Sequence, residues 1–186
     1  MFFLNLNFLA DKFGSKKGFC RFLLFGGLQF FGAFNKFKPK NIEKTKRLIF
    51  VCSGNICRSA LGHLIAEKEK FPSDSFGLHC RGNDPAFDKT VAYGLERNLE
   101  VTEHRSKNIR EYKPMAGDLL IVMEPKHLVE LRELFPEVKL LLLGFLTDYN
   151  NVYIHDPYNT NNAFFYLCME QISVATKRLV RLINAQ

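Results

Sequence analysis

The chain has 186 residues, enough for one domain with a sizeable hydrophobic core and an extension. Its formal net charge is +7, yet residues 1–47 hold ten Lys and Arg against two acidic residues, and the remainder holds sixteen against seventeen. The basic character therefore belongs to the N-terminal part and says nothing about the rest. The five cysteines show no zinc-like spacing, and their odd number argues against a disulfide framework.

Residues 1–46 form an N-terminal extension that contains eleven of the nineteen phenylalanines, interleaved with Lys and Arg. Its longest apolar stretch, residues 18–34, is interrupted by Arg21 and Gln29 and is short for a transmembrane helix, which needs about 20 apolar residues. No small-x-small cleavage site precedes Asn35, which argues against a secretory signal. Two interpretations remain: a basic amphipathic helix on an anionic membrane surface, and a helical arm packed on the rest of the chain. Nucleic acid is not an expected partner, because no recognised binding module is visible.

Residues 48–51, Leu-Ile-Phe-Val, are a short apolar run that predicts a buried strand. The strand is followed by the octapeptide Cys52-Ser53-Gly54-Asn55-Ile56-Cys57-Arg58-Ser59. Helix-forming residues from Ser59 to about Lys70 predict a helix directly after it. The octapeptide is therefore a strand-to-helix turn, whose backbone N–H groups point at whatever lies above the helix N-terminus.

The residue types in this turn indicate an anion-binding loop with a nucleophile. The helix dipole and Arg58 stabilise a thiolate at Cys52, and the guanidinium offers planar, paired hydrogen bonds to two phosphate oxygens. Gly54 and Asn55 tolerate the positive φ that a tight anion nest requires. The chemistry implied is nucleophilic attack on phosphorus.

The rest of the chain alternates strands and helices. Strands are predicted at residues 76–80, 118–123 and 139–143, and helices at 86–98, at 125–135 with Pro125 in the first position, and at the end of the chain, capped by Asn161 or Asn162. This alternation predicts an α/β domain over residues 47–186. Its four-stranded parallel sheet would be doubly wound, with helices on both faces and the phosphate-binding loop after the first strand.

The octapeptide with its preceding valine, Val-Cys-x-Gly-Asn-x-Cys-Arg-Ser, resembles the low-molecular-weight protein tyrosine phosphatases, and so does Asp156-Pro157-Tyr158 before the last helix. The resemblance covers residues 47–186 and leaves out residues 1–46. It implies hydrolysis of phosphotyrosine through a cysteinyl-phosphate, without a metal or other cofactor. In bacterial members it also implies a phosphatase that opposes a tyrosine kinase in polysaccharide assembly.

The resemblance assigns the main roles to three residues. Cys52 is the nucleophile, Arg58 with the backbone N–H groups of residues 53–58 holds the phosphate oxygens, and Asp156 is the general acid. Tyr158 lines the phosphotyrosine pocket, although a merely packed tyrosine is an alternative. Because a thiolate enzyme needs a reducing compartment, the expected location is the cytoplasm, with the extension at the inner face of the membrane as a further expectation.

Supporting roles also follow from the resemblance. Ser59 donates to the thiolate, Asn55 holds the turn of the loop, and His104 supports Asn55 unless it only caps or packs. Cys57 forms a reversible disulfide with Cys52 unless it is an ordinary core residue. The family has a serine after the second strand that hydrogen-bonds the loop, and the expected position of that serine is occupied here by Cys80.

Two other functions remain open. A thioredoxin-coupled arsenate reductase shares the loop, but it needs further cysteines in a mobile segment, and Cys80 and Cys168 are isolated. A catalytically silent phosphotyrosine-binding protein is the other, and the presence of Cys52, Arg58 and Asp156 argues against it.

Overall fold

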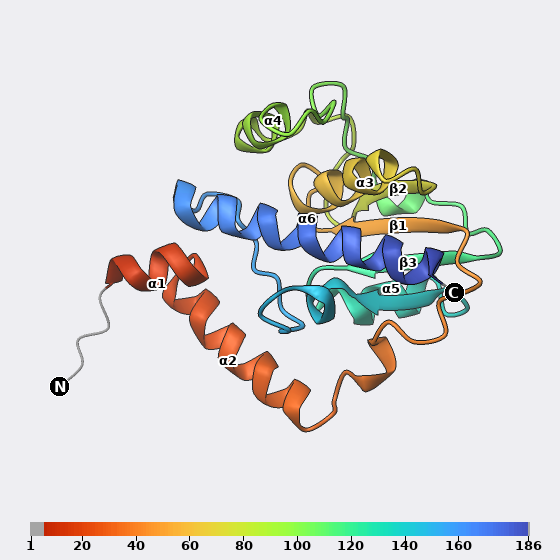
Figure 1. Ribbon diagram of the computed structural model, residues 1–186, viewed down its shortest axis with the longest axis horizontal. Coiled ribbons are helices and arrows are strands. Elements are labelled where there is room, and N and C mark those ends of the chain that lie inside the picture. The colour runs from red at the N-terminus through yellow and green to blue at the C-terminus, as the bar shows by residue number, and fades with distance from the viewer. Residues whose placement is uncertain (1–5, 186) are drawn as a thin grey trace.

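A four-stranded parallel sheet forms the centre of the protein, in a computed structural model that describes residues 6–185 (Figure 1). The strands lie in the order β2-β1-β3-β4, with bounds β1 Arg47–Cys52, β2 Ser73–Gly77, β3 Asp118–Val122 and β4 Lys139–Leu142. The helices are α1 Leu6–Phe13, α2 Lys16–Phe30, α3 Arg58–Lys68, α4 Asp88–Leu95, α5 His127–Leu134 and α6 Asn162–Asn184. This order confirms the predicted four-stranded, doubly wound α/β fold.

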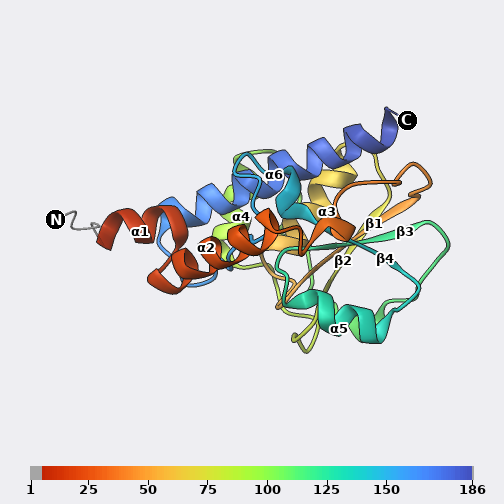
Figure 2. The same ribbon diagram turned by 90° about the horizontal axis from the view of Figure 1, so that it is seen from below.

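Both faces of the sheet are covered, as Figure 2 shows with α3 and α6 on one side and α5 on the other. Alternate residues of β1 divide between two hydrophobic clusters, because successive side chains of a strand point to opposite faces. Leu48 and Phe50 pack with α3 and α6, whereas Ile49 and Val51 pack with α5. The central strands are therefore almost entirely apolar, which is why they are recognisable from sequence.

The second strand differs from its prediction. It runs Ser73–Gly77, three residues earlier than the predicted 76–80, and pairs in register with β1 from Leu48↔Ser73 to Cys52↔Gly77. Its start, Ser-Asp-Ser, looks like a turn in the sequence, but β2 is an edge strand whose polar side chains have partners. Asp74 pairs with Lys107, and Ser75 is hydrogen-bonded to Asn55.

Two of the predicted helices also differ at their ends. The helix predicted at 86–98 is the shorter α4, which begins after Phe87. Pro125 is not the first residue of α5, since the helix begins at His127 and Pro125 lies in the preceding turn, where its carbonyl accepts from Leu128. Asn161, one of the two predicted caps, accepts a hydrogen bond from the backbone N–H of Phe164 at the start of α6.

The N-terminal extension forms a hairpin of two helices, α1 and α2, here called the hairpin (residues 6–30). Ser15 caps α2 by accepting from the backbone N–H of Gly18 at 2.9 Å. Residues 1–5 of the predicted extension lie outside the described residues. Among residues 6–185, no helix combines the length and apolar character that crossing a membrane demands.

Candidate active site

The predicted phosphate-binding loop joins β1 to α3 at the carboxyl end of the sheet, where ligands bind in open α/β folds. A cavity of about 260 Å³ opens above it. Its lining comprises Cys52, Ser53, Gly54, Ile56, Cys57, Arg58, His79, Asp156 and Tyr158. Thus the structure brings the predicted nucleophile, guanidinium and general acid to one cavity, although Asp156 lies about a hundred residues further along the chain.

Cys52 is the last residue of β1 and is almost fully buried at the floor of the cavity. Its Sγ lies 3.0 Å from Ser59 Oγ and accepts from the backbone N–H of Asn55 at 3.3 Å. Both contacts, together with the N-terminus of α3, place hydrogen-bond donors around the sulfur. These donors surround the sulfur that is predicted to be the nucleophile.

Asn55 organises the loop from beneath. Its φ of 55° is the left-handed conformation that asparagine adopts more readily than most residues. The backbone N–H of Lys107 donates to its Oδ1 at 2.8 Å, so its amide NH₂ faces the other way and donates to Ser59 Oγ and Ser75 Oγ, each at 2.9 Å. Since Ser59 Oγ accepts from Asn55, its own hydrogen is free to donate to Cys52 Sγ.

His104 lies on the other side of this asparagine, as the resemblance predicts. Its Nε2 lies 2.7 Å from the carbonyl oxygen of Asn55, and because a carbonyl can only accept, Nε2 carries the hydrogen. Burial lowers the pKa of His104, against the opposing effect of this hydrogen bond. The imidazole therefore supports the loop as a neutral donor near pH 7.

The loop-supporting serine is Ser75, not the residue at the position of Cys80. Cys80 donates to the carbonyls of Gly77 and Lys107 and does not reach Asn55. The expectation at Cys80 fails because β2 begins three residues earlier than predicted. Had the strand been predicted at residues 73–77, Ser75 within it would have been the candidate for this role.

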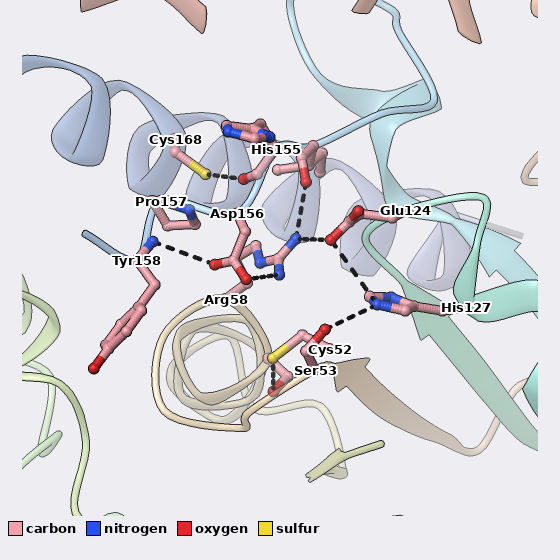
Figure 3. A network of polar contacts seen from close by, with 12 residues as sticks. Cys52, Ser53, Arg58, Glu124, His127, His155, Asp156, Pro157, Tyr158 and Cys168 are labelled. Carbon is pink, nitrogen blue, oxygen red and sulfur yellow. Dashed lines mark hydrogen bonds and ion pairs between the residues drawn. The ribbon is translucent and has the colours of Figure 1, made fainter. Parts of the chain in front are cut away.

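Arg58, the first residue of α3, is only 1% exposed and lies between two carboxylates, as Figure 3 shows. One terminal nitrogen donates to Glu124 Oε1 at 2.7 Å and to the carbonyl of Ile154 at 3.0 Å, and the other lies 2.9 Å from Asp156 Oδ2. Burial alone would lower the pKa of Arg58, but the negative charges of Asp156 and Glu124 raise it. The guanidinium is thus a fixed positive charge at the cavity.

Glu124, which follows β3, was not foreseen from the sequence. Burial alone would raise its pKa, but the charge and hydrogen bond of Arg58 bring the pKa of Glu124 below its usual value. The carboxylate therefore stays ionised and orients the guanidinium. A single glutamate after a buried strand matches no sequence motif. Its role depends on Arg58, which lies 66 residues earlier in the chain.

Replacing Glu124 with alanine should lower the free energy of unfolding by about 3 kcal/mol, because it leaves a buried guanidinium with half of its counter-charge. Lys126→Ala is the matched control. Its ammonium contacts the same carboxylate at 3.4 Å but is half-exposed, so its loss should cost about 0.5 kcal/mol or less. Urea unfolding of both variants measures the difference, and equal effects would contradict a structural role for the Arg58–Glu124 pair.

Asp156 and Tyr158 stand at the rim of the cavity. The Asp156 carboxylate is 42% exposed and accepts from the backbone N–H of Tyr158 at 3.2 Å, so it can reach both Arg58 and an entering substrate. The ring of Tyr158 is half-exposed and packs against Phe87, with 5.0 Å between ring centroids. The Tyr158 ring lines the entrance as an aromatic wall, and Phe87, which was not predicted from the sequence, packs against that ring.

His127, the first residue of α5, is completely buried below the loop. Its Nε2 lies 3.2 Å from Ser53 Oγ and 3.9 Å from Glu124 Oε1, while Nδ1 has no partner among the described residues. Burial lowers the pKa of His127 to about 3, although Glu124 acts in the opposite direction. The ring is therefore neutral across the physiological range.

This buried imidazole predicts a pH-dependent stability. Because its folded-state pKa lies below its unfolded value of 6.5, its contribution is fully present above pH 6.5 and is lost as the pH falls below that value. From about pH 7.5 to about pH 5.5, the loss should be about 1 kcal/mol. Urea unfolding of His127→Gln should show a pH slope reduced by this amount, whereas His79→Gln, at an exposed position, should not. An unchanged slope in His127→Gln would contradict the assignment.

Cys57 is buried beside the cavity, and burial raises its pKa to about 12. It is therefore a thiol in the structure, where the five cysteines are all free. Its position in the lining of the cavity that also contains Cys52 leaves both predicted roles open, a core residue and a redox partner.

Comparisons with known proteins agree with this geometry. The family model described as low molecular weight phosphotyrosine protein phosphatase matches residues 47–186. The low molecular weight protein-tyrosine-phosphatase Wzb of Escherichia coli K12 is 26% identical over 146 residues, which cover 75% of this chain and 96% of Wzb. The Etp phosphatase of the same strain is 28% identical over 147 residues, covering 74% and 97%.

The fold comparison points the same way. The crystal structure of the tyrosine phosphatase Wzb from Escherichia coli K30 in complex with sulphate superimposes with a TM-score of 0.64 and 26% identity. The match covers 74% of this chain and 99% of that structure. From the family match and the fold together, the chain belongs to the low molecular weight phosphotyrosine protein phosphatase family and is a protein-tyrosine-phosphatase.

Proposed function

We propose that the chain hydrolyses phosphotyrosine in proteins with Cys52 as nucleophile, Arg58 as phosphate ligand and Asp156 as general acid. The observation that carries this proposal is the convergence of the three side chains on one cavity of about 260 Å³. Asp156 Oδ2 lies only 2.9 Å from the Arg58 guanidinium, so proton donor and phosphate ligand are adjacent before substrate arrives. The supporting groups Ser59 and Asn55 are in place around the sulfur.

In the first step, the thiolate of Cys52 attacks phosphorus in line with the leaving tyrosine oxygen. The P–S bond forms as the P–O bond breaks, and Asp156 gives its proton to the departing phenolate. Arg58 and the backbone N–H groups of the loop hold the equatorial oxygens, whose charge is stabilised by preorganised donors. In this proposal the ring of Tyr158, which lines the cavity and packs against Phe87, contacts the phenyl ring of the substrate.

In the second step, Asp156 acts as a base and takes a proton from a water molecule that attacks the cysteinyl-phosphate. The P–S bond breaks, inorganic phosphate forms, and the thiolate of Cys52 is released. The hydroxyl of Ser59, 3.0 Å from Sγ, stabilises that departing charge. No proton is gained or lost by the enzyme over the full cycle.

Hydrolysis of matched phosphotyrosine and phosphoserine peptides by the reduced protein tests the proposal. We expect turnover of the first and at least about tenfold less of the second, since the acid and the aromatic wall are placed for an aryl ester. If neither peptide were hydrolysed, the proposal would be contradicted. Arsenate reduction coupled to thioredoxin would then be assayed, because that chemistry shares the loop.

We further propose that the hairpin binds an anionic membrane surface. Exposed apolar side chains lie on α2 and directly after it, with Phe30 and Phe31 85% and 84% exposed, and the exposed bases Lys16, Lys17 and Arg21 lie toward the start of α2. A helix that exposes both apolar side chains and positive charge favours a lipid interface with anionic headgroups. The other side of the hairpin packs on the phosphatase domain, so this contact requires no rearrangement of the fold.

Sedimentation with lipid vesicles tests this contact. The full chain should bind vesicles that contain phosphatidylglycerol, with affinity that falls as salt rises, and the Phe30→Ser/Phe31→Ser variant should bind at least about tenfold less. Lack of binding to these vesicles would leave the hairpin as a packed arm only. Binding that is equal for purely phosphatidylcholine vesicles would contradict the electrostatic part.

From the resemblance to bacterial members, we propose a tyrosine kinase of polysaccharide assembly as the phosphoprotein substrate. The inactive Cys52→Ser variant should retain the phosphorylated form of such a kinase and release its dephosphorylated form. Retention of both forms, or of neither, would contradict this partner.

We also propose that Cys57 protects Cys52 from irreversible oxidation. Peroxide converts the Cys52 thiolate to a sulfenic acid, and the Cys57 thiol displaces water from it to form a disulfide. After peroxide, a dithiol should restore activity to the wild type but not to Cys57→Ser. Equal recovery of both would contradict the role.

A further inference from the structure

The hairpin lies against the irregular stretch of chain that carries the general acid. This stretch, residues 147–161, is here called the acid segment, and it connects the 3-10 turn at Leu143–Leu146 to α6. In Figure 1 and Figure 2, α1 and α2 lie beside it and beside the start of α6. Because the acid segment has no regular secondary structure, its conformation depends on the side chains that bind its backbone.

Gln29, near the end of α2, makes the most direct of these contacts. Its Oε1 accepts from the backbone N–H of Val152 at 2.9 Å, and its Nε2 donates to the carbonyl of Asn150 at 2.8 Å. One side-chain amide thus bonds both a backbone N–H and a backbone carbonyl of the acid segment, as the backbone of a neighbouring strand would. Val152 is fully buried, so loss of this partner would leave an unsatisfied N–H in the interior.

Three further contacts tie the hairpin to both ends of the acid segment. Asn151 Nδ2 donates to the carbonyl of Phe22 at 3.0 Å, and Asn161 Nδ2 donates to Asp11 Oδ1 at 2.7 Å. At the turn of the hairpin, Gly14 has a φ of 74°, and a Cβ built there would lie 2.8 Å from the ring of His155. The hairpin backbone therefore approaches the residue immediately before Asp156 as closely as glycine permits.

Close to Asp156, the phosphatase domain also holds the acid segment, since Cys168 Sγ of α6 donates to the carbonyl of His155 at 3.5 Å. Ile154 donates to the carbonyl of Met123 at 2.9 Å and accepts from Arg58, whereas Asp156 itself contacts only Arg58 and the N–H of Tyr158 among the described residues. Between hairpin and acid segment lies a cavity of about 330 Å³ whose apolar lining includes Phe13, Phe22, Ile154 and Phe164. Since side chains do not fill this space, the position of the acid segment depends more on its hydrogen bonds to the hairpin.

We propose that the hairpin clamps the acid segment and that Gln29 is a positioning residue for the general acid Asp156. This inference rests on the proposed role of Asp156 in phosphotyrosine hydrolysis. It makes the N-terminal extension part of the catalytic unit, because Gln29 fixes Val152, and Val152 lies two residues before Ile154, whose carbonyl binds the same guanidinium as Asp156.

The leaving-group dependence of Gln29→Ala tests the proposal. A misplaced acid slows esters of weakly acidic phenols, which need protonation, and spares esters of strongly acidic phenols. We expect kcat/KM to fall about tenfold or more for a phosphotyrosine peptide and for phenyl phosphate, and less than about twofold for dinitrophenyl phosphate. Gln29→Glu, which keeps the acceptor for Val152 N–H, should lie between Gln29→Ala and the wild type. Leu24→Ala, on the exposed side of the same helix, should match the wild type.

A double variant separates positioning from general destabilisation. If Gln29 acts through Asp156, then Gln29→Ala should cause no further loss in the Asp156→Asn background. A loss that is equal for all leaving groups, or that adds fully to that of Asp156→Asn, would overturn the proposal. If Asp156→Asn itself showed no leaving-group dependence, the proposed acid would be wrong, whereas that dependence in Asp156→Asn with none in Gln29→Ala would overturn only the clamp.

Discussion

Replacing Cys52 with serine should reduce hydrolysis of a phosphotyrosine peptide by about 10⁴-fold or more, the range found when an enzyme loses its nucleophile. Serine occupies nearly the same volume, so the loop should keep its shape and its hydrogen bond to Ser59. A serine hydroxyl, however, is far less acidic than a cysteine thiol and therefore stays protonated and weakly nucleophilic. Steady-state assays with wild type and Cys52→Ser measure the loss.

A binding measurement tells whether Cys52→Ser has lost only the chemical step or also the folded loop. Because Arg58 and the backbone N–H groups of the loop are unchanged, Cys52→Ser should still bind inorganic phosphate, which calorimetry can measure. Cys80→Ser is the matched control, since Cys80 lies outside the loop and bonds only backbone carbonyls, and it should retain activity within about twofold. Activity in Cys52→Ser within tenfold of the wild type would contradict a nucleophilic role.

Replacing Asp156 with asparagine should lower kcat for phosphotyrosine by about 10² to 10⁴, the usual contribution of a positioned acid. Asparagine keeps the size and one oxygen that can accept from Arg58, but it cannot give a proton to the phenolate. The loss should therefore grow as the leaving phenol becomes less acidic. A series of aryl phosphates of graded leaving-group pKa provides the measurement.

The matched control for this variant is Asp148→Asn, on the same acid segment. Asp148 pairs with Arg178 at 2.7 Å at the surface and lines no part of the site, so its loss should change kcat by less than about twofold. If Asp156→Asn lost activity equally for every leaving group, Asp156 would be acting on phosphate binding through Arg58 and not as an acid.

The centre of the fold and the loop were accessible from the sequence for physical reasons. Strands buried on both faces are continuous apolar runs, as at residues 48–51 and 119–123. Of the two turn residues predicted to take a positive φ, Asn55 has one and Gly54 does not. The nucleophile and its arginine lie in one octapeptide whose spacing carries the geometry. Asp156 was found because Asp-Pro-Tyr stands before the last helix, a pattern that the family resemblance identifies.

Residues that act across the fold escaped prediction. Ser75 supports Asn55 from a strand whose polar start reads as a turn, and Glu124 orients Arg58 from 66 positions away. Gln29 looks in the sequence like an interruption of an apolar helix, yet it faces the acid segment 123 residues later. Each of these contacts depends on the packing of separate elements, which local periodicity does not encode.

The most direct test of the proposed mechanism is detection of the covalent cysteinyl-phosphate intermediate. Wild type mixed with excess phosphotyrosine peptide, quenched within a single turnover and digested, should yield the peptide containing Cys52 with one added phosphoryl group, as measured by mass spectrometry. The label should disappear in Cys52→Ser and persist in Cys57→Ser. Turnover with no phosphoryl group on Cys52, or with the group on another residue, would contradict the proposed mechanism.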